Sequence, residues 1–362
     1  MKNTFGNAIS VTIFGESHGP YIGAVLDGIA PGIKVDEDYI REALDKRRPY
    51  GSISTQRRES DNFSIVSGVF EGHTTGTPIT ILIPNENTKS KDYSQLTDIP
   101  RPSHADYSAN VKYHGFQDYR GGGHFSGRIT AALVAAGAIV NYTLQNKGIF
   151  IGTHILKLHG VSDKKLTNEA EIKELGTKLF PVIDAKAEEK MKEEILIAGE
   201  RGDSVGGVLE SAIFGVPAGV GEPFFDSLES QLSHMLFSIP GIKGVEFGDG
   251  FDISDMYGSE ANDAFILDGG EVKTLTNHSG GINGGISNGM PITFKCAVKP
   301  TPSIFVEQRS VSLSRKEEVT LNLQGRHDPA IIHRVRAVVD AAAAIAIADM
   351  LVSRFGTDYL TN

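Results

Sequence analysis

A glycine-rich segment at residues 118–130, DYRGGGHFSGRIT, holds the side chains best suited to chemistry. Three consecutive glycines let backbone N–H groups approach a ligand closely, and a helix after them would offer its positive N-terminus to an anion. Arg120 and Arg128 add guanidinium groups that can donate paired hydrogen bonds to a phosphate or carboxylate. The segment therefore predicts an anion-binding loop. A purely structural turn is the alternative, because glycine-rich turns are common at helix starts.

Three further motifs place a histidine or an aspartate in a tight turn: GESHG at residues 15–19, RPSHAD at 101–106 and GRHDP at 325–329. A histidine near its usual pKa can give or take a proton at neutral pH, which makes His18 and His104 candidate acid–base groups. Asp328 is a third candidate, although it could instead cap the helix that follows it. The structural alternatives for the two histidines are a turn residue and an exposed loop residue.

Positive charge gathers near these motifs although the chain carries a formal net charge of −10. Such a balance disfavours general affinity for nucleic acid or an anionic membrane, so an anionic ligand must meet locally concentrated bases. Paired arginines suit phosphate and carboxylate groups. The bases in question are Arg41, Lys46, Arg47, Arg48, Arg57, Arg58, Arg101, Arg120, Arg128 and Arg326. A solvated surface cluster is the alternative, above all for Arg57 and Arg58.

Other classes of function are disfavoured by the scarcity or spacing of the residues they need. Cys296 is the single cysteine, which excludes an internal disulfide and a multi-cysteine metal site and fits a reducing cytoplasm. The 11 histidines show no HExxH or comparable spacing, so we expect no metal site. A hydrolase built from Ser17, His18 and Asp328 is disfavoured, because GESHG is not the GxSxG elbow and adjacent Ser and His side chains do not pair as nucleophile and base.

The hydrophobic pattern predicts a layered α+β arrangement of hairpin strands and buried helices. Strand-like runs occupy residues 10–14, 22–26, 63–70, 78–84, 202–216, 241–251 and 291–298. Helical patterns occupy residues 36–48, 129–144, 185–196 and 335–355. The apolar stretches 129–144 and 341–348 are shorter than the roughly 20 residues of a membrane span, and the N-terminus shows no export signal. We therefore expect a cytoplasmic protein that does not enter a membrane.

Taken in order, eight blocks of the chain resemble the chorismate synthase family. They are GESHG, the stretch from RRP to TQRRE, RPSHADY, DYRGGGHFSGR, FSIPGIKGVEFGDGF, NHSGGINGGIS, KPTPSI and GRHDP, and they span nearly the whole sequence. The resemblance implies a large β-α-β sandwich of the α+β class, with helices enclosed between antiparallel sheets. It also implies a single domain over residues 1–362 and a homotetramer.

The same resemblance implies a reaction. Chorismate synthases convert 5-enolpyruvylshikimate 3-phosphate to chorismate by 1,4-anti elimination of phosphate and a C6 hydrogen, the last common step of the shikimate pathway to the aromatic amino acids. They are carbon–oxygen lyases that require reduced FMN without net redox change. Since no added reductase segment is evident, we expect an external flavin reductase, with NADPH as the indirect reductant. A form that reduces its own flavin with NADPH and an inactive flavin- or phosphate-binding relative are the alternatives.

By match to the family's motifs, five arginines would bind the substrate's anionic groups: Arg47, Arg48, Arg101, Arg128 and Arg326. The resemblance also places Arg47 near a nicotinamide site. His104 would assist the departure of phosphate, and His18 would keep the reduced flavin in a suitable protonation state. Asp328 would help flavin N5 act as the base for the C6 proton, while Ser17 and Ser126 would position groups at the flavin.

The FMN contacts implied by the resemblance come from several motifs. They are Arg47, His124, Phe125, Ser126, Pro240, Gly241, Gly284, Lys299, Pro300, Thr301, Pro302, Ser303 and Arg326. The chain also departs from the family's pattern at three places. His124-Phe125-Ser126 stands where Arg-Ser-Ser is common, Ile53 stands near a frequent Arg, and Asp340 replaces a usual Glu.

Overall fold

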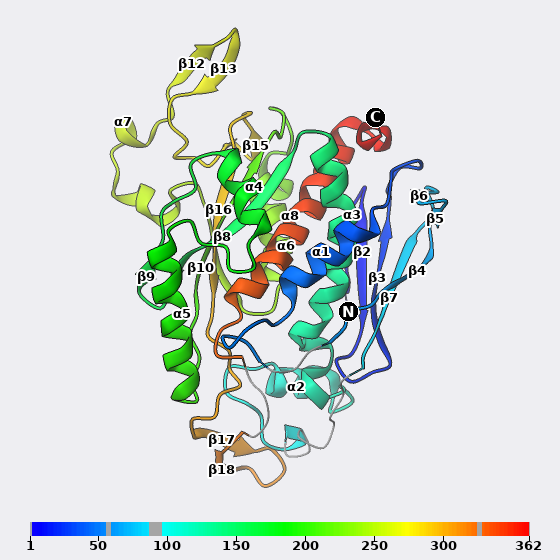
Figure 1. The fold of residues 1–362 in the computed structure, drawn as a ribbon, viewed down its shortest axis with the longest axis vertical. Coiled ribbons are helices and arrows are strands. Elements are labelled where there is room, and N and C mark those ends of the chain that lie inside the picture. The colour runs from blue at the N-terminus through cyan, green and yellow to red at the C-terminus, as the bar shows by residue number, and fades with distance from the viewer. Residues whose placement is uncertain (1, 56–58, 87–95, 324–327, 362) are drawn as a thin grey trace.

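The protein folds into two antiparallel β-sheets with helices enclosed between them (Figure 1). The computed structural model describes residues 2–55, 59–86, 96–323 and 328–361. Two long helices, α3 (Thr130–Asn146) and α8 (Ile332–Phe355), run through the middle of the sandwich. The fold class expected from the sequence, an α+β sandwich with helices between antiparallel sheets, is confirmed.

The first sheet has the strand order β1-β2-β3-β7-β4. Its strands are β1 (Thr4–Phe5), β2 (Ser10–Gly15), β3 (Tyr21–Asp27), β7 (Ile79–Pro84) and β4 (Ser64–Ser67). Ile79, Ile81 and Ile83 are fully buried and alternate with half-buried residues, because successive side chains of a strand point to opposite faces. The short connection from β2 to β3 contains Ser17 and His18, so both residues lie at one end of this sheet.

The second sheet has the strand order β11-β16-β10-β8-β9. Its strands are β11 (Ile242–Phe247), β16 (Ile292–Val298), β10 (Gly207–Phe214), β8 (Phe150–Leu158) and β9 (Val161–Ser162). In β16 the side chains of Ile292, Phe294 and Cys296 alternate inward and are fully buried. Burial raises the pKa of the Cys296 thiol to about 12, which keeps it protonated as a small apolar core residue.

The enclosed helices approach each other closely. α3 packs on the first sheet, α8 packs on the second, and the two helices contact each other along their length. At their crossing, a Cβ atom on Gly137 would lie 2.5 Å from the Cβ of Ala341, so only glycine fits there. Two shorter helices, α1 (Glu37–Arg47) and α6 (Leu228–Phe237), also pack against α8. The alanine- and glycine-rich composition of both long helices follows from this close packing.

A buried carboxylate fastens α8 to the first sheet. Asp349, which is 2% exposed, accepts hydrogen bonds from the backbone N–H groups of Asn7, Ala8 and Ile9 at 2.7–3.1 Å. These N–H groups precede β2 and would otherwise be buried without partners, which is costly. The bonds therefore fix where the first sheet meets the central helix.

The remaining elements lie outside the sandwich core. They are the helices α2 (Asp106–Tyr113), α4 (Glu169–Thr177), α5 (Ala185–Glu200) and α7 (Gly258–Ala261), and the hairpins β5 (Val69–Phe70) with β6 (His73–Thr74), β12 (Phe265–Asp268) with β13 (Glu271–Thr274), β14 (Ile282–Asn283) with β15 (Ile286–Ser287), and β17 (Gln308–Ser312) with β18 (Glu317–Leu321). The β12–β13 hairpin projects away from the body of the molecule (Figure 1).

Helices with a strong hydrophobic periodicity were predicted correctly from the sequence, whereas several shorter elements were not predicted. The predicted helices at 36–48, 129–144, 185–196 and 335–355 correspond to α1, α3, α5 and α8. α2 was missed within a polar stretch, because only Ala109 of its eight residues is buried and no apolar face repeats. α4, α6 and β8 were also not predicted.

In the part of the chain that the structure describes, one helical stretch is long and apolar enough to cross a membrane. This stretch is Gly127–Asn146, and 83% of its most apolar part is buried inside the fold. Packing by the first sheet and α8 accounts for this burial. The expectation that residues 129–144 form a buried helix is confirmed.

A buried histidine lies between two carboxylates behind the second sheet. His154 is fully buried, with Nε2 2.9 Å from a Glu210 oxygen and Nδ1 3.3 Å from an Asp163 oxygen. Burial alone would lower the pKa of His154, but the hydrogen bonds to Asp163 and Glu210 together raise it. Asp163 also accepts the N–H groups of Ile183 and Asp184, so the histidine joins β8 and β10 to the loop before α5.

We predict that His154→Gln destabilises the protein in a pH-dependent way. The substitution leaves two buried carboxylates without their cation, which costs on the order of 3 kcal/mol of unfolding free energy. The folded-state pKa of His154 is raised, so its contribution is complete below the unfolded value of about 6.5 and is lost as the pH rises through the folded value. Thermal unfolding between about pH 5.5 and about pH 9 should show the largest difference in Tm at the acidic end.

The matched control is His159→Gln. His159 also contacts a carboxylate, Glu194 at 2.9 Å, but its side chain is exposed, so solvent screens the pair. Its Tm should stay close to that of the unsubstituted protein at every pH. Equal losses in both variants, or a loss in His154→Gln that grows with pH, would contradict the prediction.

Candidate active site

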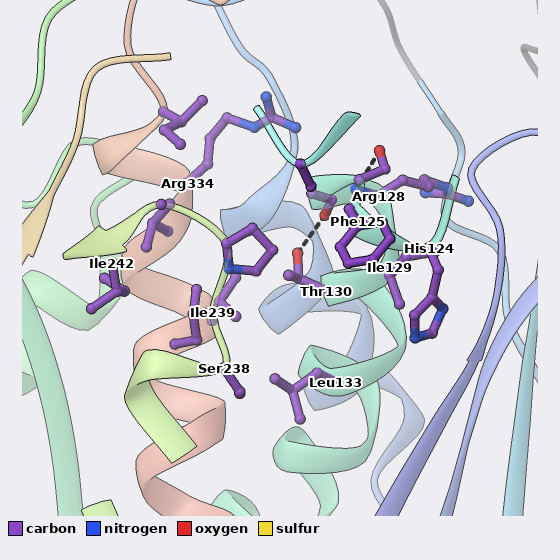
Figure 2. Close-up of a pocket in the computed structure, with 18 of the residues that line it drawn as sticks. His124, Phe125, Arg128, Ile129, Thr130, Leu133, Ser238, Ile239, Ile242 and Arg334 are labelled. Atoms are coloured by element: carbon purple, nitrogen blue, oxygen red, sulfur yellow. Dashed lines mark hydrogen bonds between the residues drawn. The ribbon is translucent and has the colours of Figure 1, made fainter. Parts of the chain in front are cut away.

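A cavity of about 900 Å³ opens where the central helices begin. Its walls come from the N-terminal turns of α3 and α8, the C-terminal ends of α1 and α6, the N-terminal strands, and the segments at 101–105 and 299–303. Figure 2 shows Thr130 and Leu133 of α3, Arg334 of α8, and Ile239 and Ile242 lying around the same space. The positive ends of two long helices therefore face the cavity, which favours anions there.

One part of the wall is cationic and another is apolar. Five arginines and two lysines line the cavity, against the carboxylates of Glu59, Asp61 and Asp328. The apolar part includes Val11, Ile13, Leu133, Ile239, Ile242, Val335 and Val338. The volume falls in the range of cofactor and ligand pockets, roughly 300–1,000 Å³. A ligand with an apolar part and several negative groups fits this division.

Asp61 holds two buried guanidinium groups together. Arg47 Nη1 lies 3.3 Å from one carboxylate oxygen, and Arg128 Nη1 donates to the other, with all three residues at most 6% exposed. Burial would raise the pKa of Asp61, but the charges of Arg47 and Arg128 hold it below the ordinary value. The backbone of Asp61 has φ +51°, an uncommon conformation for an aspartate. Asp61 was missed from the sequence, where it stands two residues after the TQRRE stretch and belongs to no motif.

The same two arginines are fixed by further acceptors. Arg47 donates to Thr130 Oγ1 at 3.0 Å and to the Gly127 carbonyl at 2.9 Å. Arg128 donates to Asn85 Oδ1 at 2.9 Å and to the Pro84 carbonyl at 3.1 Å. α1 thus delivers Arg47 to the first turn of α3, where the glycine-rich segment ends.

Arg101, His104 and Asp106 form a second cluster. Asp106 Oδ2 accepts hydrogen bonds from Arg101 Nε and from its backbone N–H, and Asp106 Oδ1 accepts from Arg101 Nη2 at 2.8 Å. His104 Nδ1 lies 2.6 Å from the same Oδ1. Arg101 Nη1 also donates to Ser303 Oγ at 3.1 Å, which joins this turn to the segment after β16.

Asp328 is held by two donors at the start of α8. The backbone N–H of Thr55 donates to Oδ1 at 2.7 Å, and Arg334 Nη1 donates to Oδ2 at 2.5 Å. Arg334 Nε donates to the carbonyl of Arg47. The structural alternative for Asp328, a helix cap, is wrong, because α8 begins after Ile331 without a side-chain cap. Arg334, which lines the cavity, was missed because it lies just before a helical pattern interpreted as core.

Two of the three consecutive glycines pack against histidine side chains, whereas the third, Gly123, lies against the Asp118 carbonyl. A Cβ on Gly121 would lie 2.3 Å from His18 Cε1 and 2.9 Å from Ser17 Oγ, and one on Gly122 would lie 3.2 Å from His104 Cε1. Both glycines have positive φ. Ser17 and His18 are buried directly behind Gly121 and do not themselves line the cavity.

The anion-binding role expected of Arg120 is not supported. Its guanidinium and its backbone N–H donate to Asp118, and Arg120 does not line the cavity. The N–H of Gly122 donates to the Tyr119 carbonyl at 3.2 Å and is therefore engaged within the loop. Arg128, at the end of the same segment, is the arginine that does reach the cavity.

Most of the other residues expected at the site line this one cavity. They are Arg47, Arg48, Arg101, His104, His124, Phe125, Ser126, Arg128, Pro240, Gly241, Lys299, Pro300, Thr301, Pro302, Ser303 and Asp328. Gly284 does not line the cavity, since it lies in the turn of the β14–β15 hairpin. Arg326, with Arg57 and Arg58, lies outside the described residues.

The three departures from the family's pattern have local explanations. His124 Nδ1 lies 2.8 Å from the Gly15 carbonyl, so the imidazole fastens the glycine-rich segment to the end of β2. Ile53 is 5% exposed and packs in the hydrophobic core. Asp340 is half-buried on α8, and the loss of solvent around it raises its pKa to about 6 against the opposing charges of Arg336 and Lys46.

Known proteins match the chain over nearly its full length. A family model described as chorismate synthase matches residues 9–352. The chorismate synthase of Pyrococcus abyssi is 46% identical over 96% of this chain and 97% of its own length, and that of Methanothermobacter thermautotrophicus is 45% identical over 97% and 94%. A crystal structure of chorismate synthase superposes with a TM-score of 0.76 at 27% identity, covering 98% of this chain and 94% of that one.

We predict that Asp61→Asn destabilises the protein and that added phosphate restores part of the loss. The change leaves Arg47 and Arg128 buried without their shared anion, at a cost on the order of 3 kcal/mol. Inorganic phosphate in the cavity would supply the missing negative charge, so it should raise the Tm of the variant more than that of the unsubstituted protein. Thermal unfolding with and without phosphate, in a low-salt buffer, measures both effects.

Asp118→Asn is the matched control, because it breaks a carboxylate–arginine pair that lies outside the cavity. Its response to phosphate should equal that of the unsubstituted protein. The same phosphate response in all three proteins would show that Asp61 does not neutralise an anion site.

Proposed function

The chain belongs to the chorismate synthase family, and we propose that its cavity binds 5-enolpyruvylshikimate 3-phosphate beside reduced FMN. The activity is that of a chorismate synthase, EC 4.2.3.5, in the shikimate pathway to the aromatic amino acids. The family uses reduced FMN. Particular side chains of this chain can be assigned to that chemistry.

The observation that carries the assignment is the group of arginines at one end of a largely apolar cavity. The substrate has one phosphate and two carboxylates, and Arg47, Arg48, Arg101 and Arg128 all line the space that would receive them. Each is already held by a carboxylate, so the guanidinium groups are oriented before the ligand arrives. Charge stabilisation is strongest where donors are fixed in advance and water is scarce. Arg326 is proposed as a fifth contact from the resemblance alone.

Reduced FMN would lie against the apolar wall, close to the segments that the resemblance assigns to it. Its phosphate and ring edges would meet His124, Phe125, Ser126, Pro240, Gly241 and the residues from Lys299 to Ser303. Reduced FMN supplies, when bound, an electron-rich ring that the family's reaction uses without net redox change. Gly284 remains assigned by resemblance only, and Arg47 is further proposed near a nicotinamide site.

His104 is the proposed proton donor to the departing phosphate. It lies between Arg101 and Lys299, which attract a phosphate to the same place. Burial lowers the pKa of His104, while its hydrogen bond to Asp106 opposes that shift. An incoming phosphate dianion would raise the pKa again, because an adjacent negative charge favours the protonated ring. Binding of the substrate phosphate would thus favour the protonated form of His104, which is the form that can donate a proton.

Asp328, His18 and the two serines complete the proposed site. Asp328 offers a carboxylate whose position is set by Thr55 and Arg334, and it would help the flavin accept the C6 proton. His18 would act on the flavin's protonation from behind Gly121. Ser126, whose hydroxyl accepts the Arg128 N–H at 3.3 Å, and Ser17 would position groups at the ring.

We also propose a homotetramer, an external flavin reductase with NADPH as indirect reductant, and a cytoplasmic location. Exposed apolar side chains between residues 224 and 267 support the assembly. They are Phe224, Phe225, Phe251, Tyr257, Phe265 and Leu267, all at least 71% exposed. Exposed apolar patches mark interaction surfaces, and symmetric self-association is the commonest way to cover them.

The decisive experiment is anaerobic turnover of 5-enolpyruvylshikimate 3-phosphate with chemically reduced FMN, following chorismate and phosphate together. Equal amounts of both products are expected. His104→Ala and His18→Ala should each lower kcat by about tenfold or more, because an acid–base group typically contributes a factor of about 10² to 10⁴. Near-normal rates in both variants would remove their roles. Flavin binding without product would identify an inactive relative, and turnover in air with NADPH alone would identify a self-reducing form.

We predict that a double substitution on the projecting hairpin, Phe265→Ser with Leu267→Ser, shifts the tetramer toward smaller species. The two side chains are 71% and 77% exposed, so their loss removes apolar area from an interface and not from the fold. Light scattering after size-exclusion chromatography measures the mass. Phe70→Ser, an equally exposed aromatic on the β5–β6 hairpin at the other side of Figure 1, should leave the mass unchanged. A monomeric starting protein would rule out the proposed assembly.

A further inference from the structure

We propose that Asp106 positions His104 for proton transfer, by holding one ring nitrogen so that the other is left for the ligand. The proposal rests on the acid–base role of His104 in the proposed function. Asp106 does not line the cavity, whereas His104 and Arg101 do. It therefore acts from behind the wall, as a positioning residue and not as a catalytic one.

The Asp106 carboxylate is fixed by several donors. It stands at the first residue of α2, and its side chain is 10% exposed. Arg101 donates three hydrogen bonds to this carboxylate, from Nε and Nη2 at 2.8 Å each and from its backbone N–H at 3.0 Å. A carboxylate bound by a two-pronged guanidinium has little freedom to rotate. The remaining contact, to His104, therefore has a defined direction.

The contact with His104 sets the ring's tautomer. Nδ1 lies 2.6 Å from Asp106 Oδ1 and 3.1 Å from Arg101 Nη2. Nδ1 cannot both donate to the carboxylate and accept from the guanidinium. Since Arg101 Nη2 already donates to Oδ1 at 2.8 Å and the 2.6 Å contact is the shorter one, Nδ1 carries the proton. Nε2 is then the nitrogen that exchanges a proton with a ligand, as in other carboxylate–histidine pairs.

The ring is also supported on its other edge. Gly122 lies so close that a Cβ there would be 3.3 Å from His104 Nε2 and 3.2 Å from Cε1. The main-chain N–H of His104 donates to the Arg101 carbonyl, and Lys299 Nζ donates to the Ser103 carbonyl. The imidazole is therefore fixed between a carboxylate and a bare backbone, which limits its rotation toward or away from the cavity.

Asp106 also keeps the proton on His104. The charged groups that face this ring are Asp106 and Arg101 from its own turn and Lys299 from the segment after β16. Burial and the two cations lower the pKa of His104, and Asp106 is the group that raises it. Removal of the carboxylate charge should therefore make His104 lose its proton at a lower pH.

The test compares Asp106→Asn, His104→Ala and the double variant, each as holoenzyme with reduced FMN under anaerobic conditions. Asp106→Asn should lower kcat by about tenfold or more while KM for 5-enolpyruvylshikimate 3-phosphate changes by less than about threefold. The amide that replaces the carboxylate would donate a hydrogen bond to His104 Nδ1, so the ring proton would move to Nε2. The alkaline limb of the kcat profile should also move to lower pH. In the His104→Ala background, Asp106→Asn should add little further loss, because it acts through the missing ring.

The same factor of loss in both backgrounds, or a change confined to KM, would show that Asp106 merely supports the fold or Arg101. If His104→Ala alone keeps a near-normal rate, the role of His104 in the proposed function fails instead. If His104→Ala loses the rate but Asp106→Asn keeps both rate and pH profile, only the positioning role of Asp106 fails.

Asp249→Asn is the matched control. Asp249 Oδ2 lies 2.5 Å from His278 Nδ1, the same kind of contact, and neither residue lines the cavity. Its kcat, KM and pH profile should equal those of the unsubstituted enzyme. Should Asp106→Asn fail to fold, ¹⁵N NMR of the imidazole in the unsubstituted holoenzyme decides the matter, with the His104 signals assigned by His104→Ala. A neutral ring protonated on Nδ1 is expected, and one protonated on Nε2 would overturn the proposal.

Discussion

Arginine side chains that leave water need carboxylate partners, and this requirement organises one end of the molecule. Arg47 and Arg128 share Asp61, and Arg101 is held by Asp106. A buried charge without its partner costs several kcal/mol, so these pairs must form as the chain folds. They join α1, the start of α2 and the glycine-rich segment around one space. The contacts that stabilise this end are thus the contacts that orient the donors for an anionic ligand.

The central helices determine where that space can be. α3 and α8 are nearly free of polar side chains over most of their length and touch at Gly137 and Ala341, which leaves no room for a ligand between them. At their N-terminal turns both helices line the cavity, and their positive ends face it. Leu133 of α3 and Val335 and Val338 of α8 add apolar side chains to the same wall. This end of the sandwich therefore offers a ligand both apolar side chains and a positive electrostatic potential.

The glycine-rich segment lines the site region as predicted, but its glycines serve a different structural purpose from the one expected. Its glycines suggested backbone donors for a phosphate, yet Gly121 and Gly122 are needed because imidazoles from two distant loops pack against their Cα atoms. His18 comes from the first sheet, and His104 from the turn before α2. The glycines are adjacent in the sequence, but the side chains that require them to be glycine come from other parts of the chain. Arg120, beside the same glycines, turned out to pair with Asp118.

Contiguous motifs and local periodicity were enough to predict the family, the antiparallel sandwich with its buried helices, and most of the residues around the cavity. The carboxylate that holds Arg47 and Arg128, Asp61, could be found only in the folded protein, whereas Asp106 stands in the same motif as Arg101. Asp61 and Arg334 stand in stretches with no motif of their own, and each also contacts a distant segment, Asp61 through Arg128 and Arg334 through the Arg47 carbonyl. Pairing of buried charges depends on distance in space and on exclusion of water, neither of which is encoded in spacing along the sequence.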